Sequence, residues 1–589
     1  MVTSIIYAIL LITVGIVVYC GDLFFVDSYS THYTEMYNIF LSSVGILWLL
    51  WFILDIQRYI RSLHTHCGGT GGMAGMRLVE GEDGEFHIEI PMLADKKTIP
   101  EYYGFSQGRE SGSFFLKIGA AVFCFGHLTN ILLNSYKQFH AYIAPVTEEE
   151  RTMCVGNDST APMVLSHGFI YFCFSVLQLF TIFTYGNVIV NKNKSLARFG
   201  FMHCISSSIC FWIDTIKNET LDSYVEQMHP HEVCGESQND SLTTLAPPHL
   251  LSSPDSGDML ACTRSSDHTI HMARGLQCVV EVHNYCVTID PTNNTIVGVA
   301  DWFYPFSIEF SILVVGVWYI LWSNIGNIEE NKNSLDFLPS ASPMGSQEEL
   351  NRTEGHKQAL VLYADCSSST KGMFAGLFLV LFAFSTCLVI YLLVNDCTMD
   401  EYIMTAQILE CCIFLSMTAA SASLYYKIAQ RDVNPKPISF LDDLLLVICL
   451  PAFFMYGVLS LMANMLGDTE GLELWLVIIT RSIQVLQVSL QTPMIVDGLR
   501  RCSNSAWAQE HRAGRNTLMF LVVANLAVYI FQTFILKTHI YQTEIDVFSL
   551  EVWVVLTHTT QPLCIFYRFH SAVALADIWS SAYKPADYQ

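Results

Sequence analysis

The sequence predicts an all-α integral membrane protein with about twelve transmembrane helices in two six-helix halves and both termini in the cytoplasm. Of its 589 residues, 52% are hydrophobic and only 14% are charged, whereas soluble domains carry about a quarter charged residues. Apolar stretches long enough to cross a bilayer, about 20 residues each, recur along nearly the whole chain. They lack the alternating polarity of barrel strands, so helices are expected.

The apolar stretches divide the chain into consecutive spans. The first one has no basic segment before it and no small-residue cleavage site after it, so we expect a retained helix and not a signal peptide. The predicted spans cover residues 3–20, 38–57, 113–134, 163–190, 196–217, 303–325, 372–394, 402–426, 440–465, 472–496, 517–537 and 549–570.

The connections between spans predict the orientation. Most Lys and Arg residues fall in the connections that share a side with the N-terminus if that terminus is cytoplasmic, and cytoplasmic loops carry the excess of positive charge. Glycosylation sequons on the opposite side agree with this orientation. The candidate glycosylation sites are Asn157, Asn218, Asn239 and Asn293.

Polar segments predict the division of the chain. Residues 1–330 form an N-terminal six-helix half, residues 331–370 a cytoplasmic linker, and residues 371–589 a C-terminal six-helix half. The first half contains an outer loop at about 218–302 and a cytoplasmic linker at about 58–112. Both linkers have the composition of mobile segments.

A weak internal repeat supports two halves of the same orientation. Gln178 to Asn191 resembles Gln484 to Asp497 at an offset of 306 residues, so that Gln178 matches Gln484. Parallel repeats of this kind are common in membrane transport proteins.

The outer loop allows two interpretations. It holds four cysteines, and a fifth lies in another outer loop, so it could be a disulfide-stapled, glycosylated insertion. It also holds six histidines, which titrate between about pH 5 and 8 and could sense acid or bind zinc. The cysteines are Cys154, Cys234, Cys262, Cys278 and Cys286, and the histidines are His229, His231, His249, His268, His271 and His283.

Several function classes find no support. The net charge of −24 argues against nucleic acid as a partner, because phosphate binding requires clustered Lys and Arg. No Walker A, dinucleotide or HExxH motif is present, so neither an enzyme nor a cofactor or catalytic metal is expected. No TVGYG-like potassium filter occurs either.

Titratable and amide side chains inside the spans are the candidate functional residues, because a polar group in hydrocarbon must face protein or water. Scattered single carboxylates, histidines, tyrosines and glutamines favour proton relay. The alternative is that they hold helices together through ordinary hydrogen bonds. The candidates are Gln178, His203, Asp214, Glu219, Glu309, Glu410, Gln487, Gln491, Asn525, His558 and Tyr567.

The tenth span carries an amide stripe. Gln484, Gln487 and Gln491 are three and four residues apart and therefore share one helix face, where they would line a watery crevice or join helices. Near the end of the twelfth span, Arg568 and His570 are expected at the cytoplasmic interface, where long side chains reach water easily.

Four segments of the chain resemble the otopetrin family. They are Ser195 to Thr220, Tyr304 to Gly326, Pro493 to Arg501 and Phe566 to Trp579, so the resemblance extends over both halves. It covers neither the outer loop nor residues 64–112.

The resemblance implies a proton-selective channel of the plasma membrane, opened by extracellular acid. It also implies a homodimer in the lipid bilayer and an inhibitory zinc ion on the outer face. Two alternatives stay open, a proton-coupled secondary transporter and a non-conducting scaffold or receptor-like member. A channel current would follow the proton gradient alone, whereas a coupled carrier needs a second substrate.

Carried over from the family, the residues important for conduction are Asp214, Glu219, Tyr319, Gln487, Asn525 and Tyr567. In the mechanism this suggests, Asp214, Glu219 and Glu309 attract hydronium from outside, and a water wire continues along the Gln and Tyr side chains. Family members commonly carry a histidine in the helix that matches the tenth span, and this chain has none there.

Overall fold

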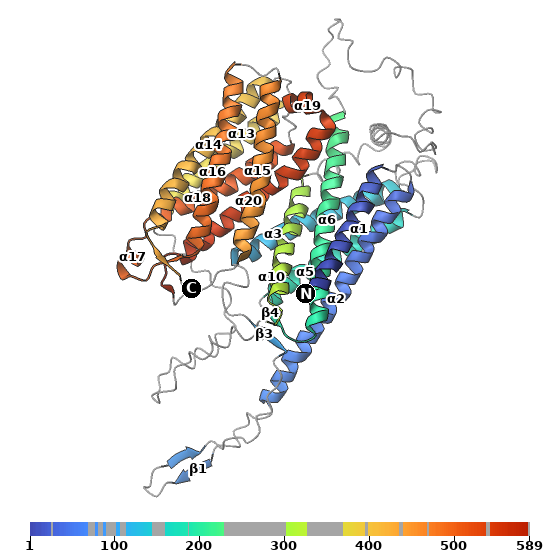
Figure 1. Cartoon of the computed structure of the whole chain (residues 1–589), viewed down its shortest axis with the longest axis vertical. Helices are drawn as coiled ribbons and strands as arrows, with labels where there is room; N and C mark the ends of the chain where they lie inside the picture. The colour runs from blue at the N-terminus through green and yellow to red at the C-terminus, as the bar shows by residue number, and fades with distance from the viewer. Residues whose placement is uncertain are drawn as a thin grey trace.

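The computed structural model consists of long helices with three short pairs of strands (Figure 1). It describes residues 1–24, 28–68, 77–80, 86–89, 102–105, 114–143, 160–186, 188–228, 302–326, 369–394, 399–434, 440–467, 471–537 and 542–586. The architecture confirms the predicted all-α membrane class.

Twelve helices correspond to the twelve predicted spans. In the described residues, eleven of them are long and apolar enough to cross a membrane, and α20 is the twelfth. The helices of the first half are α1 (Val2–Phe24), α2 (Ser28–Gly68), α3 (Phe114–Ile143), α5 (Thr160–Tyr185), α6 (Lys194–Met228) and α10 (Tyr304–Ser323). Those of the second half are α13 (Thr370–Val394), α14 (Met399–Ile428), α15 (Phe440–Leu466), α16 (Gly471–Leu499), α18 (Arg515–Lys537) and α20 (Leu550–Ser581).

Two boundaries differ from the prediction. The fourth span does not continue to residue 190, because α5 ends at Tyr185 and Val188–Val190 forms strand β4; three successive branched residues after Gly186 favour a strand. The fifth helix is longer than predicted, because α6 continues to Met228. Asn218, predicted to be a glycosylated loop residue, therefore lies within α6.

Part of the segment predicted as a mobile linker at about 58–112 has regular structure. α2 extends to Gly68, and strands β1 (Arg77–Glu80) and β2 (Phe86–Glu89) pair antiparallel. Strand β3 (Tyr103–Phe105) pairs with β4, with Tyr103 opposite Val190. Tyr103 is buried, so this end of the linker is attached to the helices.

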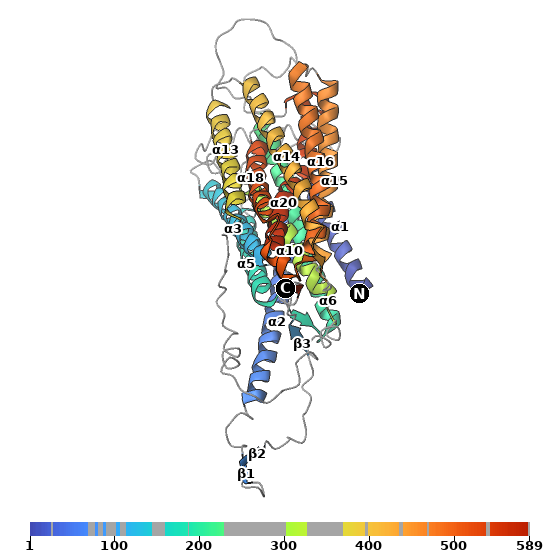
Figure 2. The same ribbon diagram turned by 90° about the vertical axis from the view of Figure 1, so that its left-hand side faces the viewer.

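The same helix packing occurs twice. In the N-terminal bundle (α1, α2, α3, α5, α6 and α10), α6 packs against α1, α2 and α10, while α5 packs against α2 and α3. In the C-terminal bundle (α13, α14, α15, α16, α18 and α20), α18 packs against α13, α14 and α20, while α16 packs against α14 and α15. Each second-half helix thus repeats the contacts of the helix six spans earlier, and the bundles lie side by side (Figures 1 and 2).

The short strands repeat as well. Strand β5 (Asp432–Val433) pairs with β6 (Arg501–Cys502), in the connections that match those of β3 and β4. We call the end of the molecule that carries these strands the strand end, and the opposite end, where α6 ends at Met228, the loop end (Figure 1).

The strands correct the register of the repeat. At an offset of 306 residues, Val188–Val190 would match residues 494–496, which are helical in α16. Gln178 precedes β4 by ten residues, and Gln491 precedes β6 by ten residues, so Gln178 matches Gln491 and not Gln484. Their contacts agree: Gln178 donates to Ser208 of α6 at 3.3 Å, and Gln491 donates to Asn525 of α18 at 3.1 Å.

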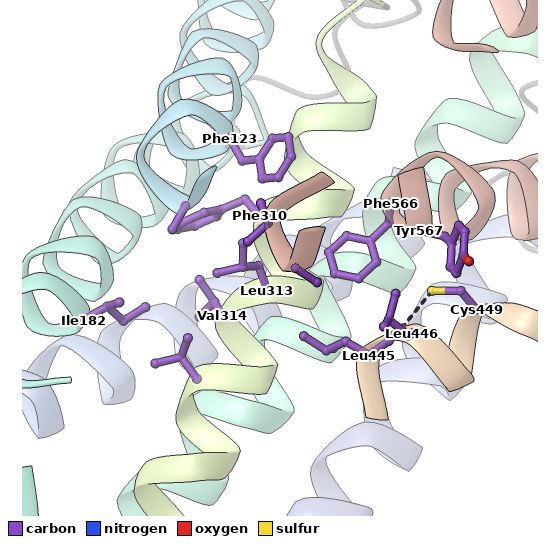
Figure 3. Close-up of a cluster of buried hydrophobic side chains, with 14 of the residues drawn as sticks. Phe123, Ile182, Phe310, Leu313, Val314, Leu445, Leu446, Cys449, Phe566 and Tyr567 are labelled. Atoms are coloured by element: carbon purple, nitrogen blue, oxygen red, sulfur yellow. Dashed lines mark hydrogen bonds between the residues drawn. The ribbon is translucent and has the colours of Figure 1, made fainter. Parts of the chain in front are cut away.

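Apolar side chains fill the contact between the bundles. Figure 3 shows Phe123 and Phe310 of the N-terminal bundle in one buried cluster with Leu445 and Phe566 of the C-terminal bundle. The ring of Phe123 lies 4.3 Å from that of Phe569, edge to face. The polar side chains between the bundles are therefore surrounded by apolar side chains.

The close packing of α6 against α2 at Gly200 can be tested by measuring stability. A Cβ at Gly200 would overlap the indole of Trp48 in α2, and Trp48 is itself buried. Gly200→Ala should destabilise the protein by about 1–3 kcal/mol, as overpacking does, and lower the melting temperature in detergent. Gly21→Ala in α1 is the control, since a Cβ there meets nothing within 4 Å; equal melting temperatures for the two variants would contradict the packing.

Candidate functional site

At the loop end of the N-terminal bundle, Asp214 is buried among partners from three helices. Its carboxylate accepts a hydrogen bond from Asn38 of α2 at 3.0 Å and forms an ion pair with Lys217, one turn along α6, also at 3.0 Å. Asn38 accepts in turn from the Tyr19 hydroxyl of α1 at 2.7 Å. The ion pair offsets part of the cost of burying either charge inside the bundle.

A second carboxylate lies close by. Glu35 of α2 contacts Nδ1 of His167 in α5 at 2.6 Å. The ring of Tyr171, one turn along α5, stacks with His167 at 5.7 Å between centroids, and its hydroxyl interacts with Ser311 of α10. These groups continue the polar region from the loop end toward the middle of the bundle.

His127 of α3 lies at the centre of a further buried network. Its two ring nitrogens are each 3.0 Å from a serine hydroxyl, Ser307 of α10 and Ser175 of α5. Asn130 also donates to Ser307 at 3.0 Å. The imidazole lies 5.0 Å from the Tyr171 ring, so the groups from Glu35 to Ser175 form one line, which we call the N-terminal polar line.

Other predicted residues of this half lie apart from the N-terminal polar line. His203 contacts the Tyr7 hydroxyl at 3.0 Å and the Leu41 carbonyl oxygen at 2.9 Å. Gln178 has its hydrogen bond to Ser208, as given above. Tyr319 is 39% exposed and stacks on Trp322, so the structure does not bring it together with the other candidates.

Two predicted carboxylates lie at the contact between the bundles. Glu309 of α10 is 0% exposed and accepts a hydrogen bond from Tyr529 of α18 at 3.2 Å. Glu219 of α6 lies 3.6 Å from Nδ1 of His558 in α20. The two pairs are reciprocal, since one joins the sixth helix to the eleventh and the other joins the fifth helix to the twelfth.

The predicted amides of the C-terminal bundle contact one another. Gln487 donates to Gln491 at 2.7 Å, and Gln491 donates to Asn525 at 3.1 Å. The Tyr567 hydroxyl lies 2.9 Å from Thr492. The amide stripe thus faces the inside of the bundle and joins α16 to α18.

Arg568 corrects the sequence analysis. It does not reach the cytoplasmic interface, because it is 0% exposed and donates through Nη1 to Gln487 at 2.6 Å inside the bundle. His570 is buried as well and lies 3.7 Å from Asp442. The predicted Glu410 forms an ion pair with Arg481 at 3.4 Å.

A buried tyrosine lies at the strand end of each bundle, Tyr103 in the first and Tyr583 in the second. Burial raises the pKa of Tyr103, and its hydrogen bond to Asp55 raises it further. Burial likewise raises the pKa of Tyr583 to about 12, although the guanidinium groups of Arg431 and Arg515 oppose that shift. Both phenols therefore stay protonated near neutral pH and can donate hydrogen bonds.

Some predictions lie outside the described residues. These are the glycosylation candidates Asn157, Asn239 and Asn293, the five loop cysteines and the six loop histidines. Within the part of the chain that the structure describes, no group of three or more His, Cys, Asp or Glu side chains could hold a metal ion.

The sequence analysis missed Glu35, His127, His167, Lys217 and Tyr529. Glu35 and Lys217 fall at the ends of predicted spans, where charged residues are ordinary. His127 and His167 were detectable, because each is a titratable side chain within a predicted span. Only the fold shows that Tyr529 contacts Glu309.

The comparisons with known proteins agree with one another on the family. The family model described as Otopetrin matches residues 115–569. The Drosophila melanogaster protein named proton channel OtopLc is 26% identical over 481 residues, which make up 80% of this chain but only 28% of that protein. Proteins named proton channel OTOP2 from Mus musculus and Homo sapiens are each 19% identical, over 70% of this chain and 75% of theirs.

The hydrogen bonds of Asn38 generate a stability prediction. Asn38→Leu removes both a donor to Asp214 and the acceptor for Tyr19, leaving buried polar atoms unsatisfied at a cost of about 1–3 kcal/mol. The melting temperature in detergent should fall accordingly. Thr13→Val is the control, because the exposed Thr13 hydroxyl bonds only to its own helix; an unchanged melting temperature for Asn38→Leu would show that the bonds do not form.

Proposed function

The chain belongs to the otopetrin family, and from this premise we propose that it is a channel that conducts protons across the membrane. Its relatives from fly, mouse and human are named proton channels. The chain spans less than a third of the length of the fly relative, so the activity is carried over as a proposal.

The observation that carries the proposal is the N-terminal polar line. Its members are carboxylate, imidazole and hydroxyl groups from four different helices. His127 and the three serines are buried, and Glu35, His167 and Tyr171 are partly buried. Consecutive members lie within hydrogen-bond distance or ring contact of one another. Groups of this kind can accept a proton on one side and release one on the other, directly or through a bridging water.

Asp214 supplies negative charge beside this line, and the carboxyl groups of Glu219 and Glu309 lie farther in. Asp214 lies beside His167 and Glu35 at the loop end, and the other two lie at the contact between the bundles. A carboxylate buried away from water favours a cation near it. Asp214 would thereby concentrate hydronium at the outer side. The sequence analysis assigns the same role to Glu219 and Glu309, but both are buried at the contact between the bundles.

Further features of the proposal come from the family resemblance and the sequence. The protein would lie in the plasma membrane with both termini in the cytoplasm, which places the loop end outside and the strand end inside. It would form a homodimer, open in response to extracellular acid and be inhibited by zinc on its outer face. Glu219 and His558 are candidates for the acid response, because their contact strengthens when the imidazole is protonated.

Asp214→Asn tests the role of the carboxylates. The substitution keeps the size of the side chain and one acceptor oxygen for Asn38, but it removes the negative charge and the ion pair with Lys217. Acid-driven proton uptake into vesicles that contain the purified protein should therefore fall about tenfold or more. Glu510→Gln is the matched control, because Glu510 is exposed in α17 (Ala506–Glu510) outside the spans.

Protein amounts in the vesicles are equalised before the comparison. Wild-type vesicles that keep an imposed proton gradient at every external pH would refute proton conduction itself. Equal uptake by Asp214→Asn and the wild type would refute the role of Asp214 alone.

A further inference from the structure

The repeat assigns Arg568 a counterpart in the N-terminal bundle. Pro305 and Trp322 of α10 are separated by the same 17 residues as Pro562 and Trp579 of α20. In this register Ser311 and Arg568 occupy the same position, six residues after the proline. Their surroundings agree, since Ser311 faces Tyr171 of α5 and Arg568 contacts Gln487 of α16, the helix that repeats α5.

Arg568 is a fixed positive charge inside the C-terminal bundle. Its guanidinium carbon lies 5.1 Å from the ring of Phe414, 5.2 Å from that of Phe453 and 5.5 Å from that of Tyr567. Aromatic faces stabilise a cation without supplying a negative charge. The guanidinium therefore keeps its charge in this environment.

Among the residues that the structure describes, no carboxylate forms an ion pair with Arg568. The acidic residue whose charge acts on it is Glu410, and Glu410 is ion-paired with a second cation, Arg481, at 3.4 Å. Atoms Nε and Nη2 of Arg568 have no hydrogen-bond partner among the described residues. These three side chains together carry one excess positive charge.

The N-terminal bundle has the opposite balance. Ser311 donates to the carbonyl oxygen of Ser307 at 2.9 Å and carries no charge. Beside the N-terminal polar line lie the carboxylates of Glu35 and Asp214 and the ammonium group of Lys217. The carboxyl group of Glu309 lies on α10 two residues from Ser311 and is hydrogen-bonded to Tyr529. The imidazoles of His127 and His167 belong to the same line, so carboxyl and imidazole groups outnumber the single ammonium group here.

We propose that Arg568 excludes protons from the C-terminal bundle, so that conduction follows the N-terminal polar line, where Ser311 holds the equivalent position. Fixed cations exclude protons in this way in other membrane pores. The predicted residues Gln487, Gln491 and Asn525 then hold Arg568 and the helices in place and do not carry current. The inference depends on the proposed function, because it names the half of the channel that conducts.

The test removes the charge in a protein whose N-terminal path is already impaired. Arg568→Met keeps a long apolar stem against the three rings, whereas Arg568→Lys keeps the charge. In the Asp214→Asn background, Arg568→Met should raise acid-driven proton uptake into vesicles about tenfold, as expected for removal of a unit charge at short range. Arg568→Lys in the same background should leave the uptake low.

The reciprocal change places the charge in the other bundle. Ser311→Arg in an otherwise wild-type chain should abolish proton uptake, whereas Ser311→Met, a neutral side chain of comparable length, should retain more of it. Gel filtration and melting temperature establish that each variant is folded, and Arg568→Gln replaces Arg568→Met if the latter is not.

The outcomes separate the two claims. If wild-type vesicles take up protons but Arg568→Met and Arg568→Lys behave alike in the Asp214→Asn background, Arg568 does not exclude protons through its charge and the inference is overturned. If wild-type vesicles take up none, the proposed function itself fails. Uptake restored by Arg568→Met and not by Arg568→Lys supports the inference, because a merely structural role would not increase the flux.

Discussion

The cost of placing a charge within hydrocarbon governs the structure. Lipid offers no hydrogen bonds, so the backbone must be helical, and each ionisable side chain must find partners inside the protein. Asp214 is paired with Lys217, Glu410 with Arg481, and Glu219 lies beside His558. The first pair lies within α6, whereas the other two join helices that are distant in sequence, so charged groups also help to fix how the helices are arranged.

Two bundles with one packing pattern carry different charges. The helices and strand pairs repeat, but a serine stands at position 311 where an arginine stands at position 568. Packing depends mainly on shape, and the repeat preserves it. The potential inside each bundle depends on a few side chains and can therefore differ between the two. In our proposal this difference in charge confines conduction to the N-terminal bundle, and the C-terminal bundle has a structural role.

The sequence predicted the spans well because hydropathy and span length are local properties. The sequence-based prediction was wrong where contacts between distant segments determine the local structure. Val188–Val190 reads as part of an apolar run, yet it pairs with Tyr103–Phe105 as a strand. Arg568 lies near the end of its apolar run and resembles an interface residue, but α20 continues to Ser581 and buries it. The contacts of Glu309 with Tyr529 and of Glu219 with His558 join opposite halves of the chain, and no local pattern encodes them.

The reversal potential of the acid-evoked current tests the central claim most directly. It should be recorded in whole cells that express the chain while the external pH is lowered in steps and the other ions are held constant. A proton channel predicts a shift of about 59 mV for each tenfold change in proton concentration, the value for one elementary charge, and no shift when external sodium or chloride is replaced. A current whose reversal potential follows another ion, or stays constant as pH changes, would contradict the account.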